Sequence, residues 1–200
     1  MSNQVNKKDQ TQELIKETAK NMFFVKGKFD ATTQEIADEA GVNRTLINYY
    51  FRSRDNLLQL VLEEAKRCEK EKSKVIYDSN LTFKEKIAGF IEESLQTSLR
   101  YPYLESYIVS QMNKGLNPHK KDDLDHAVID GLYSSLEIEM EKGNIDKMEP
   151  VQFLLNMISL LVFPSAMRPL VTENLNIGSK EFDRLISERK DIILNILFKK

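Results

Sequence analysis

Few residues in this sequence have the type and spacing that catalysis requires. His119, Asp122 and His126 lie at i, i+3 and i+7 of an expected helix, so one helical face would present all three to a metal ion. Their Lys-Lys and Asp-Asp surroundings indicate a solvent-exposed surface instead. The sequence contains no glycine-rich phosphate loop and no nucleophile elbow, and its single cysteine, Cys68, stands among charged residues. We therefore expect no enzyme, no cofactor and no metal site.

The segment 33–51 has the pattern of two short helices joined by a tight turn. Thr33 is placed to cap the first helix, whose first turn is acidic. Gly41 tolerates the left-handed conformation that ends a helix, and Asn43 can cap the second helix. This is the helix-turn-helix pattern, in which the second helix enters the major groove of DNA.

Apolar residues elsewhere recur at helical spacing and predict an all-α protein of about nine helices. The stretch 11–26 carries Ile15, Ala19, Met22 and Phe23 on one face, which is typical of an amphipathic helix. No segment has the alternation of a confident strand. Further helix starts or breaks are expected at Ser53, Thr82, Pro102, Asn117, Pro150 and Ser179, and Pro164 and Pro169 are expected to kink or break the apolar helix that contains them.

The charge is distributed unevenly along the 200 residues. Residues 1–54 carry nine Lys/Arg and seven Asp/Glu, whereas residues 55–200 carry twenty and twenty-four. A weakly basic head on an acidic body is compatible with phosphate binding by the head. The polar first ten residues and the short apolar run 157–163 predict neither secretion nor a membrane span. With a lone cysteine, these features favour a cytoplasmic location.

The stretch FDATTQEIADEAGVNRTLINYYFRSRDNLL resembles the DNA-binding segment of TetR-family (tetracycline-repressor family) transcriptional regulators. Its landmarks are the double threonine, Ala40-Gly41-Val42, the Tyr-Tyr-Phe that closes the second helix, and the Asp-x-Leu-Leu start of the next one. The resemblance covers roughly residues 11–65. It implies a three-helix DNA-binding domain at 1–53 and a larger helical domain at 54–200 for effector binding and dimerisation.

The resemblance also implies which side chains contact DNA. Arg44 is suited to a guanine and Asn48 to an adenine, while Tyr49 offers a hydroxyl to phosphate. The family commonly has Gly-Thr-Leu-Tyr where this chain has Thr45 to Asn48, so base preference does not transfer from relatives. The full expected set is Thr33, Gln34, Arg44, Thr45, Asn48, Tyr49, Tyr50, Arg52 and Arg54.

Beyond residue 65 the expectations rest on architecture. The family dimerises through its last two helices, and here the apolar run 153–162, with Ile186, Ile193, Leu194 and Leu197, supplies either that interface or plain core. A small-molecule effector is expected to release a repressor from its operator, although a ligand-independent helical DNA-binding protein fits the same residues. Residues expected to line an effector pocket, or again to form core, are Phe90, Tyr103, Tyr107, Met112, Phe153 and Met157.

Overall fold

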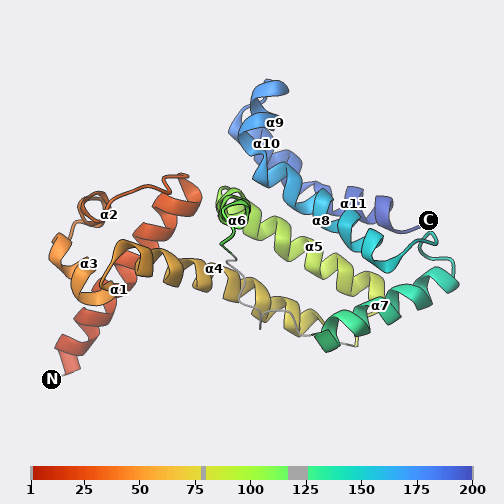
Figure 1. The fold of residues 1–200 in the computed structure, drawn as a ribbon, viewed down its shortest axis with the longest axis horizontal. Helices are drawn as coiled ribbons and strands as arrows, with labels where there is room; N and C mark the ends of the chain where they lie inside the picture. The colour runs from red at the N-terminus through yellow and green to blue at the C-terminus, as the bar shows by residue number, and fades with distance from the viewer. Residues whose placement is uncertain (1, 78–79, 117–125, 200) are drawn as a thin grey trace. The chain divides into compact units, whose positions relative to one another are not determined.

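The computed structural model describes residues 2–77, 80–116 and 126–199, and the side chains of 9–66, 80–116 and 129–199. Helices make up all the regular structure of these residues, so the all-α prediction is confirmed (Figure 1). The elements are α1 (Ser2–Lys20), the π-helical segment η1 (Asn21–Val25), α2 (Thr33–Ala40), α3 (Arg44–Phe51), α4 (Arg54–Tyr77), α5 (Phe83–Arg100), α6 (Leu104–Asn113), α7 (His126–Glu141), α8 (Pro150–Ala166), α9 (Arg168–Asn174), α10 (Ser179–Ser187) and α11 (Arg189–Leu197).

The chain divides into two compact units. Unit 1 comprises Met1–Glu71 and Tyr101–Leu104, and unit 2 comprises Lys72–Arg100 and Glu105–Lys200. The eleven α-helices of the described residues exceed the nine expected partly because two long helices are interrupted, at Met167 and at Glu188. Helix α4 passes from one unit into the other without a break.

Unit 1 has a core in which α1 and the helix-turn-helix pair share their apolar faces. The expected stripe is buried, since Ile15, Ala19 and Phe23 are all inaccessible to solvent. The short segment Tyr101–Leu104 also belongs to this core: the Tyr103 amide donates to the Phe24 carbonyl at 3.0 Å, and the Tyr101 ring meets the Phe24 ring edge-on. Other buried members of unit 1 are Ile36, Ala37, Ile47, Phe51, Leu57, Val61 and Leu62.

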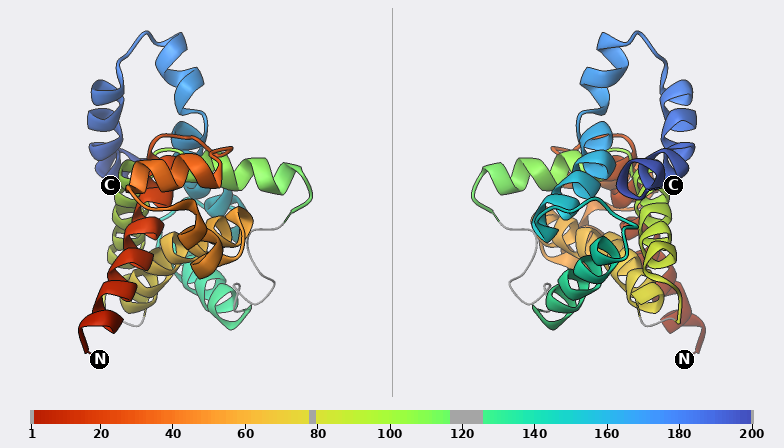
Figure 2. Two further views of the ribbon diagram at one scale, coloured as in Figure 1. Left: turned by 90° about the vertical axis from the view of Figure 1, so that its left-hand side faces the viewer. Right: turned by 90° about the vertical axis from the view of Figure 1, so that its right-hand side faces the viewer.

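Unit 2 has its own core, in which α5, α8 and α11 run side by side (Figure 2). Phe153 lies at its centre, fully buried, with its ring edge-on to Phe198 at 5.9 Å between centroids. Several apolar residues were expected to form either the core or a dimer interface. Three of them, Ile186, Ile193 and Leu197, are buried within the chain itself. The intrachain alternative therefore holds for these three, because their faces of α10 and α11 pack against α5 and α8.

Helix α8 continues through Pro164 instead of breaking there. Proline lacks the amide that would donate to the carbonyl four residues earlier, here that of Leu160. The Arg189 guanidinium donates to that carbonyl from α11 at 3.1 Å, so the missing donor is replaced from another helix. The chain turns only at Met167, where α9 leaves α8 at 73°, with Pro169 in its first turn.

Arg168 fixes α9 against α10. Its buried guanidinium pairs with Asp183 at 2.7 Å and lies 4.7 Å from the centroid of the Phe182 ring. A second donor of Arg168, its Nη2, reaches the Ser179 carbonyl at the start of α10 at 3.4 Å.

Within the described residues, no single helix is long and apolar enough to cross a bilayer. The bent pair formed by α8 and α9 meets the requirements of length and composition only when the two are taken together across their 73° break.

Replacing Phe153 with alanine should lower the free energy of unfolding by about 3–5 kcal/mol, because it removes a buried aromatic ring and leaves a cavity. The matched control is Phe163→Ala on the same helix, whose side chain is 57% exposed. The control should change stability by less than about 0.5 kcal/mol. Denaturant titration at one fixed protein concentration measures both, and equal losses would show that the core is not centred on Phe153.

Candidate nucleic-acid interface

The first helix of the helix-turn-helix pair begins with a capping box. The Glu35 amide donates to the Thr32 hydroxyl at 3.2 Å, and the Thr32 amide donates back to the Glu35 carboxylate at 2.8 Å. The amide and hydroxyl of Thr32 hold the pKa of Glu35 below its usual range. The prediction that Thr33 is the cap was wrong by one residue, because the box needs a threonine three positions before the glutamate.

The turn between the two helices is built as the sequence indicated. Gly41 ends α2 in the left-handed conformation, at φ +65°, and its amide returns to the carbonyls of the last turn. Asn43 caps α3 by accepting a hydrogen bond from the Thr45 amide at 2.9 Å. Ile47 and Phe51 are buried, which turns the opposite side of α3 toward solvent.

The exposed side of α3 carries the side chains expected to read DNA. Arg44, Thr45, Asn48 and Tyr49 are all exposed, and Tyr49 is 65% exposed although it is aromatic. Its ring meets that of half-buried Tyr50 edge-on at 5.1 Å between centroids. The structure thus brings these five residues onto one helix, where hydroxyl, amide and guanidinium donors stand over a buried apolar side.

The head of α2 lies beside the start of α3. The Arg44 Nε donates to the Thr33 hydroxyl at 3.1 Å, which joins the first residue of each helix. Gln34 is exposed and donates to Asp38 at 2.7 Å along its own helix. All these contacts are exposed, so exchanging them for contacts to another molecule costs little.

The two arginines after α3 differ in their surroundings. Arg52 ends the helix with φ +67°, a conformation that non-glycine residues rarely adopt, and its side chain is exposed. Arg54 is instead turned inward, where its Nε donates to the Ala31 carbonyl at 2.8 Å and its Nη2 donates to the Phe29 carbonyl. Sequence patterns gave both residues the same expected role and could not show this difference.

A partly buried ionic cluster attaches α4 to α1. Glu64 accepts from Lys16 at 2.6 Å and from Lys20 at 2.8 Å, with side chains only 21%, 14% and 10% exposed. Burial alone would lower the pKa of each lysine and raise that of Glu64. Hydrogen bonds outweigh burial: Lys16 donates to Glu13 and Glu64, and Lys20 donates to Glu17 and Glu64. The lysine pKa values are therefore raised and the pKa of Glu64 is lowered.

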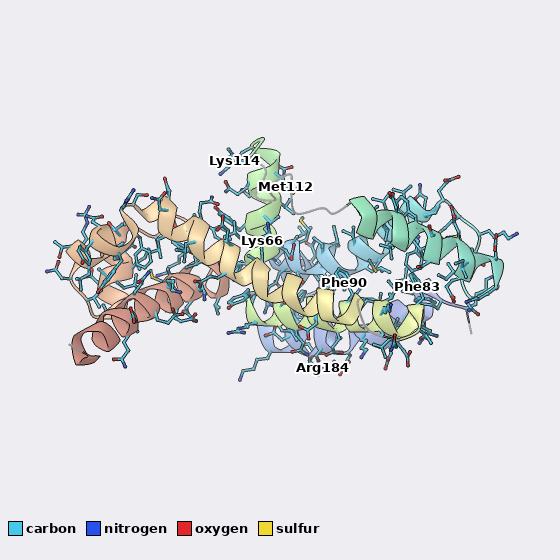
Figure 3. All side chains as sticks on the ribbon, turned by 90° about the horizontal axis from the view of Figure 1, so that it is seen from below. Lys66, Phe83, Phe90, Met112, Lys114 and Arg184 are labelled. Atoms are coloured by element: carbon cyan, nitrogen blue, oxygen red, sulfur yellow. The ribbon has the colours of Figure 1, made fainter. Side chains whose placement is uncertain are left out.

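The residues expected to line an effector pocket are only partly brought together. Phe153 and Met157 are buried on α8, with Phe90 of α5 packed against their cluster. Met112 is 52% exposed near the end of α6, well away from Phe90 (Figure 3).

The two tyrosines of that expected set lie elsewhere. Tyr103 belongs to unit 1, where its ring covers Gly27 so closely that a Cβ there would stand 3.1 Å from it. Tyr107 is buried on α6. A cavity of about 170 Å³ opens in unit 2, and its lining contains none of the expected residues: Lys84, Glu139, Asn144, Phe198 and Lys199.

The alternative interpretation of the sequence was a metal site at His119, Asp122 and His126. His119 and Asp122 lie outside the described residues, as does the side chain of His126. Among the side chains that the structure does describe, no three His, Cys, Asp or Glu groups are arranged to hold a metal ion.

Comparisons with known proteins agree with this geometry. The family model "Bacterial regulatory proteins, tetR family" matches residues 15–61, which contain α2, α3 and the start of α4. No curated protein matches the chain. The segment that carries the helix-turn-helix pair is therefore similar to the DNA-binding segment of the tetR family of bacterial regulatory proteins.

Solved structures share the fold over nearly the whole chain. The ketosteroid transcriptional regulator KstR2 of Mycobacterium tuberculosis is 16% identical, with 96% of each chain covered and a TM-score of 0.68. A TetR-family regulator of Marinobacter aquaeolei is 13% identical, with 98% of this chain and 99% of that chain covered and a TM-score of 0.62. A TetR-family regulator of Haemophilus influenzae is 15% identical, with 96% and 98% covered and a TM-score of 0.57.

The ionic cluster on α4 predicts a pH-dependent stability. Because the pKa of Glu64 is lowered from 4.5 in the folded protein, its contribution is complete above that pH and is lost as the pH falls through the folded value. Glu64→Gln should therefore destabilise the protein by about 1–2 kcal/mol near neutral pH, and the difference from wild type should shrink below pH 4.5. Thermal unfolding followed by circular dichroism between pH 3 and 8 measures it.

Asp30→Asn is the control for that series, since it removes an exposed carboxylate from the same unit. It should leave the pH profile of the melting temperature close to that of wild type. A Glu64→Gln deficit that stays constant from pH 8 to pH 3 would mean that the carboxylate charge is not what stabilises the cluster.

Proposed function

We propose that this regulator binds a specific operator through the exposed side of α3 and the head of α2. The observation that carries the proposal is the set of exposed hydrogen-bonding side chains on α3 above buried Ile47 and Phe51. Arg44 and Asn48 have the donors and acceptors to read base edges in the major groove. The side chains proposed to contact phosphate or sugar, or to orient these two, are Thr33, Gln34, Thr45, Tyr49, Tyr50 and Arg52.

We propose that the regulator acts as a cytoplasmic homodimer. A helix-turn-helix protein meets two half-sites about 34–36 Å apart, which one copy cannot contact. Helix α8 leaves Val151, Leu155 and Ile158 exposed at i, i+4 and i+7, although their neighbours on its other side are buried. Because α8 lies beside α11, a second set of exposed apolar residues can extend the same surface; it consists of Leu185 at the end of α10 and Ile192 and Ile196 of α11.

These two sets support the dimer better than the residues first expected for it. A self-complementary surface of this kind suits the two-fold symmetry of most homodimers. Arg189 lies at the junction, since it joins α11 to the Leu160 carbonyl of α8.

We further propose that the protein is a repressor released by a small-molecule effector, in the family's common mode. Such an effector would act by binding one arrangement of the heads better than the other. The support within this chain is the aromatic and methionine cluster of Phe90, Phe153 and Met157 in unit 2. A compound that both raises the melting temperature and releases DNA would identify the effector. A persistent absence of such compounds would favour ligand-independent control.

Selection of bound fragments from random duplex DNA tests the operator proposal and defines a site for quantitative work. On that site Arg44→Ala should relax the preference at one base position, with a loss of about 1–3 kcal/mol in affinity for the selected duplex. Tyr49→Phe should weaken binding to all sequences by a similar factor, because it removes a phosphate contact. If neither substitution changes binding in an electrophoretic shift titration, α3 is not the recognition helix.

Replacing Ile192 and Ile196 together with aspartate should convert the dimer to monomer, because charges would be buried at its centre. Analytical ultracentrifugation at micromolar concentration measures the change. The control is Ile138→Asp on α7, where an isoleucine is 49% exposed, compared with 52% for Ile192. Wild-type protein that sediments only as a monomer, or a control that dissociates equally, would exclude this surface as the interface.

A further inference from the structure

Arg54, the first residue of α4, uses its whole guanidinium within unit 1. Its Nε donates to the Ala31 carbonyl at 2.8 Å, its Nη2 donates to the Phe29 carbonyl, and its Nη1 pairs with Asp55 at 2.9 Å. The planar group also lies over the Phe23 ring, 5.4 Å from its centroid. With 26% of the side chain exposed, each nitrogen already has a partner before any DNA is present.

The carbonyl partners of Arg54 lie on the other side of the helix-turn-helix motif in the sequence. Ala31 directly precedes Thr32, the cap of α2, whereas Arg54 follows the end of α3 by three residues. The guanidinium therefore joins the chain just before the helix-turn-helix motif to the chain just after it. A fixed connection at both ends restricts how far α3 can rotate on the core, as closure of a loop restricts its residues.

Arg52 provides the contrast within the same connection. Its side chain is exposed, and among the described residues the structure shows no partner for it. Its left-handed backbone, at φ +67°, turns the chain out of α3 toward α4. A guanidinium with free donors on the surface is the one that can neutralise a phosphate.

We propose that Arg54 is a positioning residue for DNA recognition: it closes the helix-turn-helix motif and holds α3 in its reading orientation, while Arg52 contacts the phosphate backbone. The inference rests on the proposed binding of operator DNA, and it assigns separate tasks to two arginines that the sequence places two positions apart.

Lysine separates the two roles of an arginine at this position. A lysine keeps the positive charge but has a single ammonium, so it cannot donate in the plane of a fork to two carbonyls. A phosphate contact therefore survives Arg54→Lys largely intact, whereas a clamp between two carbonyls does not. Arg54→Met has the opposite character, because it keeps much of the apolar stem and removes the charge.

The binding experiment uses the full-length protein, the duplex selected by wild type and a random duplex of equal length, titrated at several salt concentrations. Arg54→Lys should lose about tenfold or more in affinity for the selected duplex while its affinity for the random duplex stays within about twofold of wild type. Arg54→Met should leave the slope of log K against log salt unchanged. Arg52→Ala should reduce that slope by about one on both duplexes.

The opposite pattern would overturn the assignment. It would consist of wild-type preference in Arg54→Lys, together with a slope reduced by about one in Arg54→Met. Those two results would make Arg54 a phosphate contact. A failure of wild type to select any duplex would count against the proposed operator binding instead, and the clamp would then be judged by the measurement that needs no DNA.

That measurement is hydrogen exchange of the free protein. In Arg54→Lys the amides of α2 and α3, including buried Ile36 and Ile47, should exchange at least several-fold faster than in wild type. The matched variant Arg52→Lys should not change them. Unchanged exchange in Arg54→Lys would refute the clamp.

If Arg54→Lys does not fold, nitrogen-15 arginine labelling of wild type replaces it. The Arg54 Nε–H should exchange slowly and keep its resonance when DNA is added, whereas a shift on addition of DNA would refute the clamp.

Discussion

Arginine side chains connect the helices of this protein by donating hydrogen bonds to main-chain carbonyls. In the described part of the chain, they do so at carbonyls that no main-chain amide reaches. A chain of many short helices has many ends, and each end leaves carbonyls that must find a donor when they are buried. Arg54 supplies donors to two carbonyls ahead of α2, and Arg189 supplies one to Leu160. The guanidinium suits this task because its five donors lie in one rigid plane and its charge persists under all ordinary conditions. Apolar packing brings the helices together, and these contacts fix their registers.

The contact made by Arg189 shows what such a connection costs and what it allows. Burial lowers the pKa of its guanidinium, and its Nε is buried without a partner among the described residues. The benefit is that α8 can contain Pro164 and continue to Ala166, while the Leu160 carbonyl keeps a hydrogen-bond donor. Because the same guanidinium belongs to α11, the exposed apolar residues of α11 are held beside those of α8. A hydrogen bond that no helical periodicity reveals thus joins two of the helices that carry the proposed dimer surface.

The sequence predicted most features that depend on local chemistry, although it placed the cap of α2 one residue late. Helical spacing identified the buried stripe of α1, and Gly41 and Asn43 marked the turn and the cap correctly, because each acts within a few residues of itself. Features that depend on distant partners were not predictable. Periodicity indicated that Ile193 and Leu197 face an apolar surface, but the same pattern suits a core and an interface. In the structure both residues belong to the core of unit 2. Likewise Arg52 and Arg54 are alike in sequence, and only the position of the loop at 29–31 distinguishes them.

Ion pairs and hydrogen bonds inside unit 1 reduce the number of basic side chains that can contact DNA phosphates. Of the basic residues in the first 54, Lys16 and Lys20 pair with Glu64, Lys26 pairs with Glu39, and Arg54 is held by carbonyls. Among the described side chains of residues 9–54, the further cations that can meet phosphates are Lys28, Arg44 and Arg52, although counterion release usually supplies much of the affinity for DNA. Hydrogen bonds from α3 must then contribute a large share, and these act only when the helix is correctly oriented. In the proposed dimer, two such heads double the number of contacts to DNA without requiring a more basic head.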